Sequence, residues 1–197
     1  MFKESNSKSN DFQIGKRIHI IGNSCSGKST LAIKISHRFA IPLIEIDALN
    51  WKPNWVGLHE TNPHKLDEKL VEATNSNAWV VAGSYLSFSQ RTFWNKLETL
   101  IWLDLPIYTL VLRMFVRSWQ RWRSKELLWG TNYEKFWPQF KVWKKKESLL
   151  WWIVTQHKSK RQKLMLQIRS SKWKHINFIR LKSVSEIKAF SKLLGLR

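Results

Sequence analysis

Nine residues that follow the first apolar run constrain the fold of this chain more than any other segment. The segment 22–30 reads GNSCSGKST and comes after 17–21, RIHII. The spacing G-x-x-x-x-G-K-[ST] is met by Gly22, Gly27, Lys28 and Ser29. Glycines at both ends let the backbone wrap closely, so that successive N–H groups point inward at phosphate oxygens. Because an apolar strand pattern precedes the segment and a helical pattern follows it, the sequence predicts a phosphate-binding loop between a strand and a helix.

The residues of this loop have separate expected roles. Lys28 reaches the β- and γ-phosphates of a nucleotide, the hydroxyl of Ser29 can bind Mg²⁺, and the helix that begins near Lys28 adds its positive end. Cys25 is expected to be a small filler whose backbone N–H matters more than its thiol. We therefore expect ATP and Mg²⁺ as cofactors. The expected nucleotide-binding set is Gly22, Asn23, Ser24, Cys25, Ser26, Gly27, Lys28, Ser29 and Thr30.

Strand and helix patterns alternate along the rest of the chain. Predicted strands cover 17–21, 43–46, 78–83, 99–106 and 175–181. Predicted helices run from Lys28 to about 38–42 and over 65–74, 91–97, 107–123, 147–170 and 184–195. The last helix begins with a capping box of Ser183 and Glu186, whereas 50–64, with two prolines, is expected to be loop-like. This alternation predicts an α/β fold with one doubly wound parallel sheet.

Length and cysteine content limit the class of protein. The chain has 197 residues, which suits one domain, 14–197, after a polar arm at 1–13 that we expect to be disordered. The single cysteine excludes an internal disulfide and favours the reducing cytoplasm. The apolar run 149–154 is far too short to span a bilayer, so we expect no membrane partner.

Positive charge is concentrated in the second part of the chain. Residues 1–112 hold 12 Lys and Arg against 10 Asp and Glu, a net of +2, whereas residues 113–197 hold 22 against 4, a net of +18. That excess attracts anions, which can be bound phosphates, a nucleic acid or an acidic surface. None of the six histidines has a metal-ligand spacing with the cysteine or another histidine, so no zinc site is expected.

Several motifs together resemble those of a known group of enzymes. They are GNSCSGKSTLA at 22–32, EIDALNWKPNW at 45–55, WVVAGSY at 79–85, LIWLDLP at 100–106, RMFVRSWQRWR at 113–123, and ELLWGTN followed by LLWW. Over about residues 17–195 the chain resembles P-loop kinases related to adenylate, shikimate and gluconate kinases. More narrowly, it resembles a bacterial family of small adenylate-kinase-like proteins labelled topology modulation proteins. The resemblance implies a three-layer P-loop NTPase sandwich with a five-stranded parallel sheet, a nucleotide on the loop, and a helical lid insert at about 113–165.

Asp47 is the most informative residue outside the loop. We expect it at the end of the second strand, at the carboxyl edge of the sheet where ligands of such folds bind. In the related kinases a carboxylate here contacts the acceptor hydroxyl and lies near the metal, which implies that Asp47 orients the acceptor, takes its proton, or binds Mg²⁺ with Ser29; a helix cap is the alternative. Ala82 stands where the related chains commonly have an Asp near the metal, so Asp47 is the remaining carboxylate candidate. Trp51 and Trp55 are expected either to wall the acceptor pocket or to pack internally.

Arginines recur on one face of the helix predicted at 107–123. An arginine recurs at every fourth residue, at Arg113, Arg117 and Arg121. Arg123 follows on a neighbouring face. The resemblance implies lid arginines that neutralise the γ-phosphate oxygens during transfer, while a solvated basic face is the alternative. Arg91 is a candidate contact for an acceptor anion, and the run 157–163, HKSKRQK, either adds phosphate contacts or is exposed.

We expect an ATP-dependent phosphotransferase of adenylate-kinase-like type that acts on a nucleotide or another small hydroxyl- or phosphate-bearing acceptor. Two alternatives stay open. The insert at 125–147 mixes Trp, Phe and Lys, which is typical of single-stranded nucleic-acid binding as well as of a lid that packs over substrate. A nucleic-acid partner, through polynucleotide kinase activity or nucleotide-controlled DNA binding, is therefore the less favoured alternative. Ala82 supports the other one, a nucleotide-binding domain without turnover.

Overall fold

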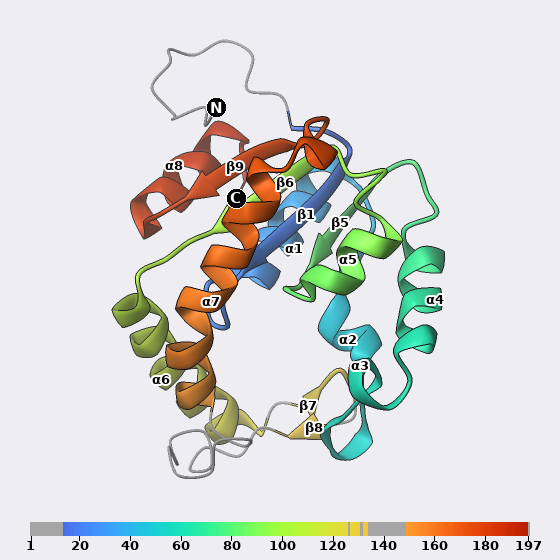
Figure 1. The fold of residues 1–197 in the computed structure, drawn as a ribbon. Helices are drawn as coiled ribbons and strands as arrows, with labels where there is room; N and C mark the ends of the chain where they lie inside the picture. The colour runs from blue at the N-terminus through green and yellow to red at the C-terminus, as the bar shows by residue number, and fades with distance from the viewer. Residues whose placement is uncertain (1–13, 126, 131, 134–148, 197) are drawn as a thin grey trace.

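A five-stranded parallel sheet forms the centre of the protein (Figure 1). The computed structural model describes residues 14–125, 127–130, 132–133 and 149–196, so the arm predicted at 1–13 lies outside the described residues. In spatial order, the strands are β2 (Leu43–Glu45), β5 (Trp79–Ala82), β1 (Arg17–Gly22), β6 (Thr99–Leu103) and β9 (Asn177–Leu181). Every neighbouring pair runs parallel, which confirms the predicted α/β architecture.

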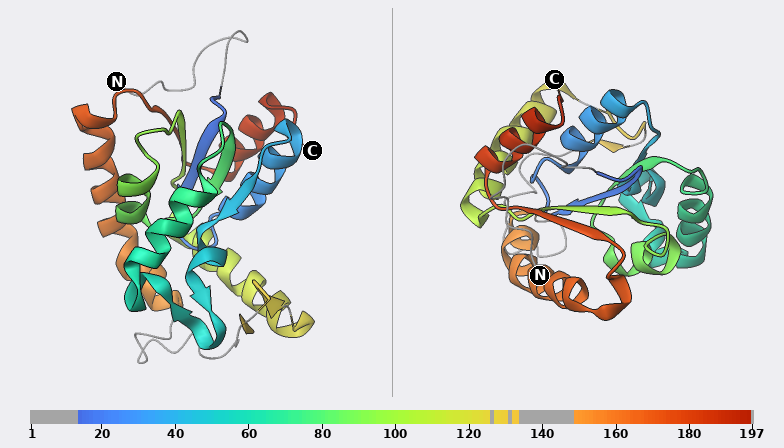
Figure 2. Two further views of the ribbon diagram at one scale, coloured as in Figure 1. Left: turned by 90° about the vertical axis from the view of Figure 1, so that its right-hand side faces the viewer. Right: turned by 90° about the horizontal axis from the view of Figure 1, so that it is seen from above.

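Helices cover both faces of this sheet, as Figure 2 shows. One face carries α1 (Lys28–Phe39) and α8 (Val184–Leu193). The other face carries α4 (Pro63–Ala73), α5 (Leu86–Thr92) and α7 (Leu149–Arg169). Ile20, Val80 and Ile101 belong to the core on the first face, and Trp79 and Trp94 belong to the core on the second. Because both faces are buried, the central strands are apolar almost throughout, as parallel strands between two helix layers must be.

The segment between β2 and α4 is more ordered than the loop predicted at 50–64. It forms α2 (Ile46–Asn50), β3 (Trp51–Lys52), the 3-10 turn η1 (Pro53–Trp55), β4 (Val56–Gly57) and α3 (Leu58–Thr61). β3 and β4 pair as a short antiparallel hairpin, because Asn54 and Trp55 take φ angles of 60° and 59° that turn the chain back. The expectation of a loop is wrong here, since such φ angles are uncommon outside glycine and local composition does not reveal them.

The second strand is also shorter than predicted. β2 ends at Glu45, and α2 begins at Ile46, whose side chain is completely buried. Asp47 therefore lies in the first turn of α2 and not at the end of a strand. Close packing between Ile46 and the backbone at Gly83 accounts for the bend, since a Cβ added at Gly83 would lie 2.7 Å from the Cβ of Ile46.

The helix predicted at 91–97 is wrong in position. α5 covers Leu86–Thr92, and its end is marked by the backbone oxygen of Ser89, which accepts hydrogen bonds from the N–H groups of Phe93 and Trp94. Phe93 and Trp94 then enter the core with no exposed surface. These two large rings follow the helix because burial against the sheet stabilises them more than a further helical turn would.

Two long helices, α6 (Ile107–Ser124) and α7, lie side by side next to the sheet (Figure 1). They confirm the helices predicted at 107–123 and 147–170. Between them, β7 (Leu127–Leu128) and β8 (Asn132–Tyr133) pair as a second antiparallel hairpin, while most of the predicted aromatic and basic insert, 134–148, lies outside the described residues. The 3-10 turn η3 (Ser171–Trp173) leads from α7 to β9. In the described part of the chain, no helix is long and apolar enough to cross a membrane.

Candidate active site

The loop between β1 and α1 has the backbone conformation that anion-binding loops need. Cys25 and Gly27 have φ angles of 63° and 96°, and left-handed residues that alternate with right-handed ones turn N–H groups toward a common point. Gly22 has no room for a side chain, since an added Cβ would lie 2.7 Å from the backbone oxygen of Leu103 and from the hydroxyl oxygen of Ser26. Gly27 is also the N-cap of α1 and contributes no side-chain cap, so the positive end of this helix suits an anion.

Lys28 points into the loop that it follows. Its ammonium group donates a hydrogen bond to the backbone oxygen of Asn23 at 3.0 Å. Burial lowers the pKa of Lys28 below its ordinary value, an effect that the carboxylate of Asp47 opposes and the positive charge of Arg117 reinforces. Asp47 and Arg117 therefore lie within electrostatic reach of the lysine that sequence analysis assigns to the phosphates.

Unpaired polar atoms beside the loop fit a site that a ligand completes. Ser26 Oγ and Arg117 Nε are buried and have no hydrogen-bond partner among the described residues. Buried polar atoms without partners cost free energy and are rare in folded proteins, so phosphate oxygens fit this place chemically. Ser29 and Thr30 are exposed in the first turn of α1, directly after Lys28.

Two of the predicted arginines reach the loop from α6. Arg113 Nη1 donates a hydrogen bond to the backbone oxygen of Ser26 at 3.0 Å, and Arg117 Nη1 lies 3.8 Å from Cys25 Sγ. A spacing of four residues puts the two guanidinium groups on successive turns of one helix face. This face of α6 is therefore turned toward the phosphate loop, as expected of arginines that bind phosphate.

Three further arginines were expected to bind anions. Arg121 lies one turn farther along α6 and is partly buried, and Arg123 is exposed in the last turn. Arg91 binds within the protein: its Nε lies 2.9 and 2.8 Å from the two carboxylate oxygens of Asp67, and its guanidinium lies 4.0 Å from the ring centroid of Phe88. These contacts join α5 to α4, and anion binding by all three arginines stays a prediction.

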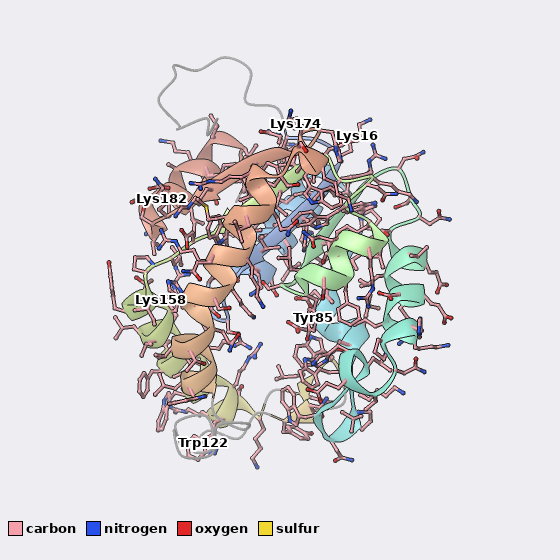
Figure 3. All side chains as sticks on the ribbon, in the orientation of Figure 1. Lys16, Tyr85, Trp122, Lys158, Lys174 and Lys182 are labelled. Atoms are coloured by element: carbon pink, nitrogen blue, oxygen red, sulfur yellow. The ribbon has the colours of Figure 1, made fainter. Side chains whose placement is uncertain are left out.

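Asp47 is held by a residue that the sequence did not single out. The hydroxyl of Tyr85 donates a hydrogen bond to Oδ1 of Asp47 at 2.8 Å, and the amide of Asn50 donates one to the same hydroxyl at 3.2 Å. Figure 3 shows Tyr85 next to α2. Burial raises the pKa of Tyr85 far above its ordinary value, and the negative charge of Asp47 raises it further, so the phenol keeps the proton that it donates.

The turn after β5 connects the phosphate loop with Asp47. The hydroxyl of Ser84 accepts a hydrogen bond from the backbone N–H of Gly22 at 3.1 Å and donates one to the backbone oxygen of Gly22 at 2.5 Å. The next residue, Tyr85, binds Asp47. Ala82 is buried at the end of β5 and supplies no carboxylate there. Polar side chains at the carboxyl end of a predicted strand are the signal that could have identified Ser84 and Tyr85.

Lys160 on α7 adds positive charge to the same place. The pKa of Lys160 is lowered to about 7, chiefly by burial and then by the positive charge of Lys28, whereas Asp47 raises it. Lys160 is therefore near both the loop lysine and the carboxylate. Of the two interpretations of the run 157–163, phosphate contact fits Lys160, while its neighbour Lys158 is exposed.

Asp104 fixes α7 against the sheet. Its Oδ2 accepts hydrogen bonds from Nε and Nη2 of Arg180 on β9, at 2.9 and 2.5 Å, and lies 3.4 Å from Nε of Arg161 on α7. The Asp104 side chain is 4% exposed, so this buried charge has the partners that it requires. Since Arg161 is the neighbour of Lys160, the anchor also sets where Lys160 lies.

The hairpin β7–β8 binds the hairpin β3–β4 through contacts that we name the clasp. Asn132, which is 3% exposed, accepts a hydrogen bond from the backbone N–H of Trp55 at 2.9 Å and donates one to the backbone oxygen of Lys52 at 3.0 Å. The indole N–H of Trp55 donates to the backbone oxygen of Tyr133 at 3.3 Å, and the rings of Trp55 and Trp129 pack edge to face with centroids 5.8 Å apart. The clasp thus joins the segment after α6 to the segment after α2.

A row of aromatic rings continues from the clasp toward Asp47. Trp51 packs edge to face against Trp55 and against His59, with centroids 5.6 Å apart in each pair, and His59 packs against Tyr85 at 5.5 Å. Trp51 and Trp55 therefore lie together on the side of the site where Asp47 and Tyr85 meet. Their ring contacts favour internal packing, and their role as an acceptor wall stays a prediction.

Ser29 and Asp47 remain the candidates for binding Mg²⁺. Among the described residues, no group of three or more His, Cys, Asp or Glu gathers as a metal site would require. Mg²⁺ usually keeps several waters and binds one or two protein ligands together with phosphate oxygens. A hydroxyl and one carboxylate beside the phosphate loop therefore fit this ion.

Sheet order and loop together define the class of protein. The order β2-β5-β1-β6-β9 puts the loop at the carboxyl end of the central strand, where ligands of open α/β sheets bind. The chain therefore has the α/β P-loop NTPase fold that its sequence predicts.

Comparisons with known proteins give distant likenesses. No family model matches the chain. A curated protein of Bacillus subtilis (strain 168), the uncharacterized protein YqaC, is 26% identical over 121 residues, which are 61% of this chain and 66% of that protein, slightly less than two-thirds of its length. Similar solved structures include a gluconokinase from Sinorhizobium meliloti 1021 (16% identity, 91% of this chain and 89% of that one, TM-score 0.48). Another is a shikimate kinase from Acinetobacter baumannii in complex with shikimate (13% identity, 93% of this chain and 96% of that one, TM-score 0.48). A third is a deoxyadenosine kinase from M. mycoides with bound dATP (15% identity, 90% of this chain and 98% of that one, TM-score 0.42).

Proposed function

We propose that the protein is an ATP-dependent phosphotransferase of adenylate-kinase-like type that acts on a nucleotide or another small acceptor with a hydroxyl or phosphate group. One observation carries the proposal: Lys28 of the phosphate loop lies within electrostatic reach of Asp47, Arg117 and Lys160, which come from three other helices. Like charges repel, and the pKa values of Lys28 and Lys160 are lowered, so the cluster holds its full positive charge only when a polyanion joins it. This excess of positive charge supports the binding of a nucleotide triphosphate.

Each of these residues has a defined task in the proposed reaction, for which ATP supplies the phosphoryl group. The loop N–H groups and Lys28 bind the β- and γ-phosphates. Arg113, Arg117 and Lys160 offset the negative charge that spreads over the γ-phosphate oxygens. Asp47 orients the acceptor hydroxyl and takes its proton while the new P–O bond forms and the bond to the β-phosphate oxygen breaks.

The segment of α6 and α7 acts as a lid in this proposal, over about residues 113–165. Arg113, Arg117 and Lys160 all come from it and face the loop. The clasp holds its β7–β8 hairpin on β3–β4, which joins the lid to the acceptor side. A lid of this kind excludes water, which would otherwise compete with the acceptor for the phosphoryl group.

Basic residues also lie away from the phosphate loop, which bears on the nucleic-acid alternative. Lys16 and Lys174 precede β1 and β9, and Figure 3 places both at the opposite end of the sheet from Tyr85. That part of the basic surface is unexplained by a nucleotide. A nucleic-acid partner, through polynucleotide kinase activity or a DNA-binding role like the topology modulation label, is therefore one competing proposal. A nucleotide-binding domain without turnover, which Ala82 supports, is the other. Action in the cytoplasm is part of our own proposal.

The proposal is tested by offering γ-labelled ATP and Mg²⁺ together with nucleosides, nucleotides, sugars and oligonucleotides as acceptors. We expect label on one small acceptor, a rate at least about 1,000-fold lower in Lys28→Ala, and an unchanged rate in Lys34→Ala on the same helix. Full transfer by Lys28→Ala would reject the phosphate-loop assignment. Label on oligonucleotides alone would favour the nucleic-acid alternative, and ATP binding without any transfer would favour a domain without turnover.

A further inference from the structure

Asp47 is the end of a chain of hydrogen bonds that begins at His59. α2 places Asp47 and Asn50 three residues apart, so both side chains meet the same partner, Tyr85. Tyr85 Oη lies 2.8 Å from Asp47 Oδ1 and 3.2 Å from Asn50 Nδ2. Asn50 is fully buried, and its Oδ1 lies 2.9 Å from both the backbone nitrogen and Nδ1 of His59. The chain thus joins α3, α2 and the turn after β5.

The backbone of His59 determines the direction of this chain. A backbone N–H can only donate, so the oxygen of the Asn50 amide must face His59 and its NH₂ group must face Tyr85. The Tyr85 hydroxyl accepts that bond, and its single proton is then left for Asp47. The contact between Asn50 Oδ1 and His59 Nδ1 requires a proton on Nδ1.

Ring packing keeps the Tyr85 hydroxyl in place. The ring of Tyr85 packs edge to face with those of His59 and Phe88, at centroid distances of 5.5 and 6.4 Å. His59 packs in turn against Trp51 at 5.6 Å. Edge-to-face pairs resist rotation of the rings, so the hydroxyl keeps one position relative to α2.

Tyr85 occupies only one oxygen of Asp47. Oδ1 accepts the phenol proton, and no residue of the described ranges donates a hydrogen bond to Oδ2. A carboxylate is planar, so a charge-assisted bond to one oxygen also sets the direction of the other. Small errors in the orientation of a catalytic group cost large factors in rate, which makes this direction important for catalysis.

We propose that Tyr85, aligned by Asn50 and His59, is a positioning residue that aims the second oxygen of Asp47 at the acceptor hydroxyl. This inference rests on the proposed function, which gives Asp47 its acceptor. Tyr85 itself does not contact the reacting atoms, and it acts through Asp47 alone.

A kinetic double-mutant cycle tests this dependence on Asp47. Tyr85→Phe keeps the ring and removes the donor, so we expect kcat to fall about 10-fold with an unchanged KM for ATP. In the Asp47→Asn background, Tyr85→Phe should cause no further fall, because the residue acts only through the carboxylate. Tyr108→Phe, at an exposed position of α6, is the matched control and should leave kcat unchanged in both backgrounds. A second 10-fold fall in the Asp47→Asn background would overturn the inference.

The hydrogen bond from Asn50 to Tyr85 is tested with a separate variant. Asn50→Asp keeps the acceptor toward His59 and loses the donor toward Tyr85. We expect it to lower kcat by a factor similar to that of Tyr85→Phe, and to add little when Tyr85 is already Phe. An Asn50→Asp effect that is equally large with and without the Tyr85 hydroxyl would separate Asn50 from the chain and contradict the proposed alignment.

An unfolding measurement tests the bond without any substrate. Urea midpoints are compared for the unchanged protein, Tyr85→Phe, Asp47→Ala, which removes the acceptor oxygen, and the double variant. If the hydroxyl binds the carboxylate, the midpoint shift of the double variant is smaller than the sum of the single shifts. Additive shifts would overturn the inference.

The two proposals fail in different ways. Lys28-dependent transfer together with an unchanged rate in Tyr85→Phe would overturn the positioning role alone. Absence of all Lys28-dependent transfer would overturn the proposed function, and the urea cycle would then still decide whether Tyr85 holds Asp47.

Discussion

The phosphate loop and the region around Asp47, which the proposed function makes the acceptor side, are built in different ways. The loop comes from consecutive residues, 22–30, and its shape depends on the backbone conformation at Cys25 and Gly27. The acceptor side comes from separate segments and depends on bonds between side chains, such as that of Tyr85 with Asp47. A backbone-built site keeps its shape when side chains change, whereas a site built from side chains can be altered by one substitution in any contributing segment.

The two regions meet at the turn after β5. The backbone oxygen of Gly83 bonds His19 Nε2 at 2.9 Å, Ser84 bonds both backbone groups of Gly22, and Tyr85 bonds Asp47. Three consecutive residues thus tie the central strand, the loop and the carboxylate to one another. The spacing between the phosphate loop and Asp47 therefore depends on this turn.

Asp47→Asn removes the charge of this side chain and keeps its shape. We expect it to separate the transfer rate from the affinity for ATP more than any other variant. The rate of transfer should fall about 100-fold or more, because a general base is lost, while the Kd for ATP changes less than about twofold. Single-turnover transfer and calorimetric titration with ATP measure the two effects. Glu68→Gln, at an exposed position of α4, is the control and should change neither. Equal losses in rate and in ATP affinity would mean that Asp47 supports the loop and that the regions are not separate.

Mild acid should lower the stability of the whole fold through His19, which bonds the turn where the two regions meet. Burial lowers the pKa of His19 to about 3, against an ordinary value near 6.5, and the ring is neutral where it bonds Gly83 and accepts from Trp94. Below pH 6.5 the unfolded chain gains a proton that the folded chain refuses, so stability is complete above that pH and falls toward pH 3. The expected loss is about 2 kcal/mol at pH 5.

Urea unfolding between pH 8 and 5 measures this dependence, and His19→Asn should give a flatter curve over the same range. A slope that is unchanged in His19→Asn would assign the acid sensitivity to other groups and disprove the role given to this histidine.

A smaller effect is expected for Ser84→Ala, which removes both bonds between the turn and Gly22. Unfolding should require about 1.5 kcal/mol less, because two backbone groups lose a partner. The Kd for ATP should rise together with the Kd for the acceptor, since the turn serves both regions. Ser87→Ala, at an exposed position of α5 three residues later, is the matched control. If only ATP binding weakens, the turn does not couple the two regions.

The smallest effect is expected for Asn132→Ala, which opens the clasp. We expect the KM for the acceptor to rise about threefold and the KM for ATP to stay unchanged, because the clasp binds the acceptor side of the site and leaves the loop alone. Tyr133→Phe is the control, since it keeps the backbone oxygen that Trp55 binds. If the KM for ATP changes more than the KM for the acceptor, the clasp acts on the phosphate loop instead.

Residues on regular local patterns lie where the sequence places them in the fold, and their roles stay predictions. Lys28 and Ser29 follow from a fixed spacing, and Arg113 and Arg117 follow from a four-residue repeat on a helix that the structure confirms as α6. Asp47 was placed at the right edge of the sheet but in the wrong element, because the early end of β2 depends on the packing of Ile46. Ser84, Tyr85 and Asn132 were not singled out, and Lys160 was named only within the run 157–163.

Local sequence was sufficient for the loop, the five strands of the main sheet and the two long helices, because backbone conformation and apolar periodicity are properties of neighbouring residues. Tertiary structure alone decided which polar side chains meet. The bonds of Tyr85 with Asp47, Ser84 with Gly22, and Asn132 with Trp55 join residues 38, 62 and 77 positions apart. Such contacts depend on where packed helices and turns place a side chain, which no short segment specifies.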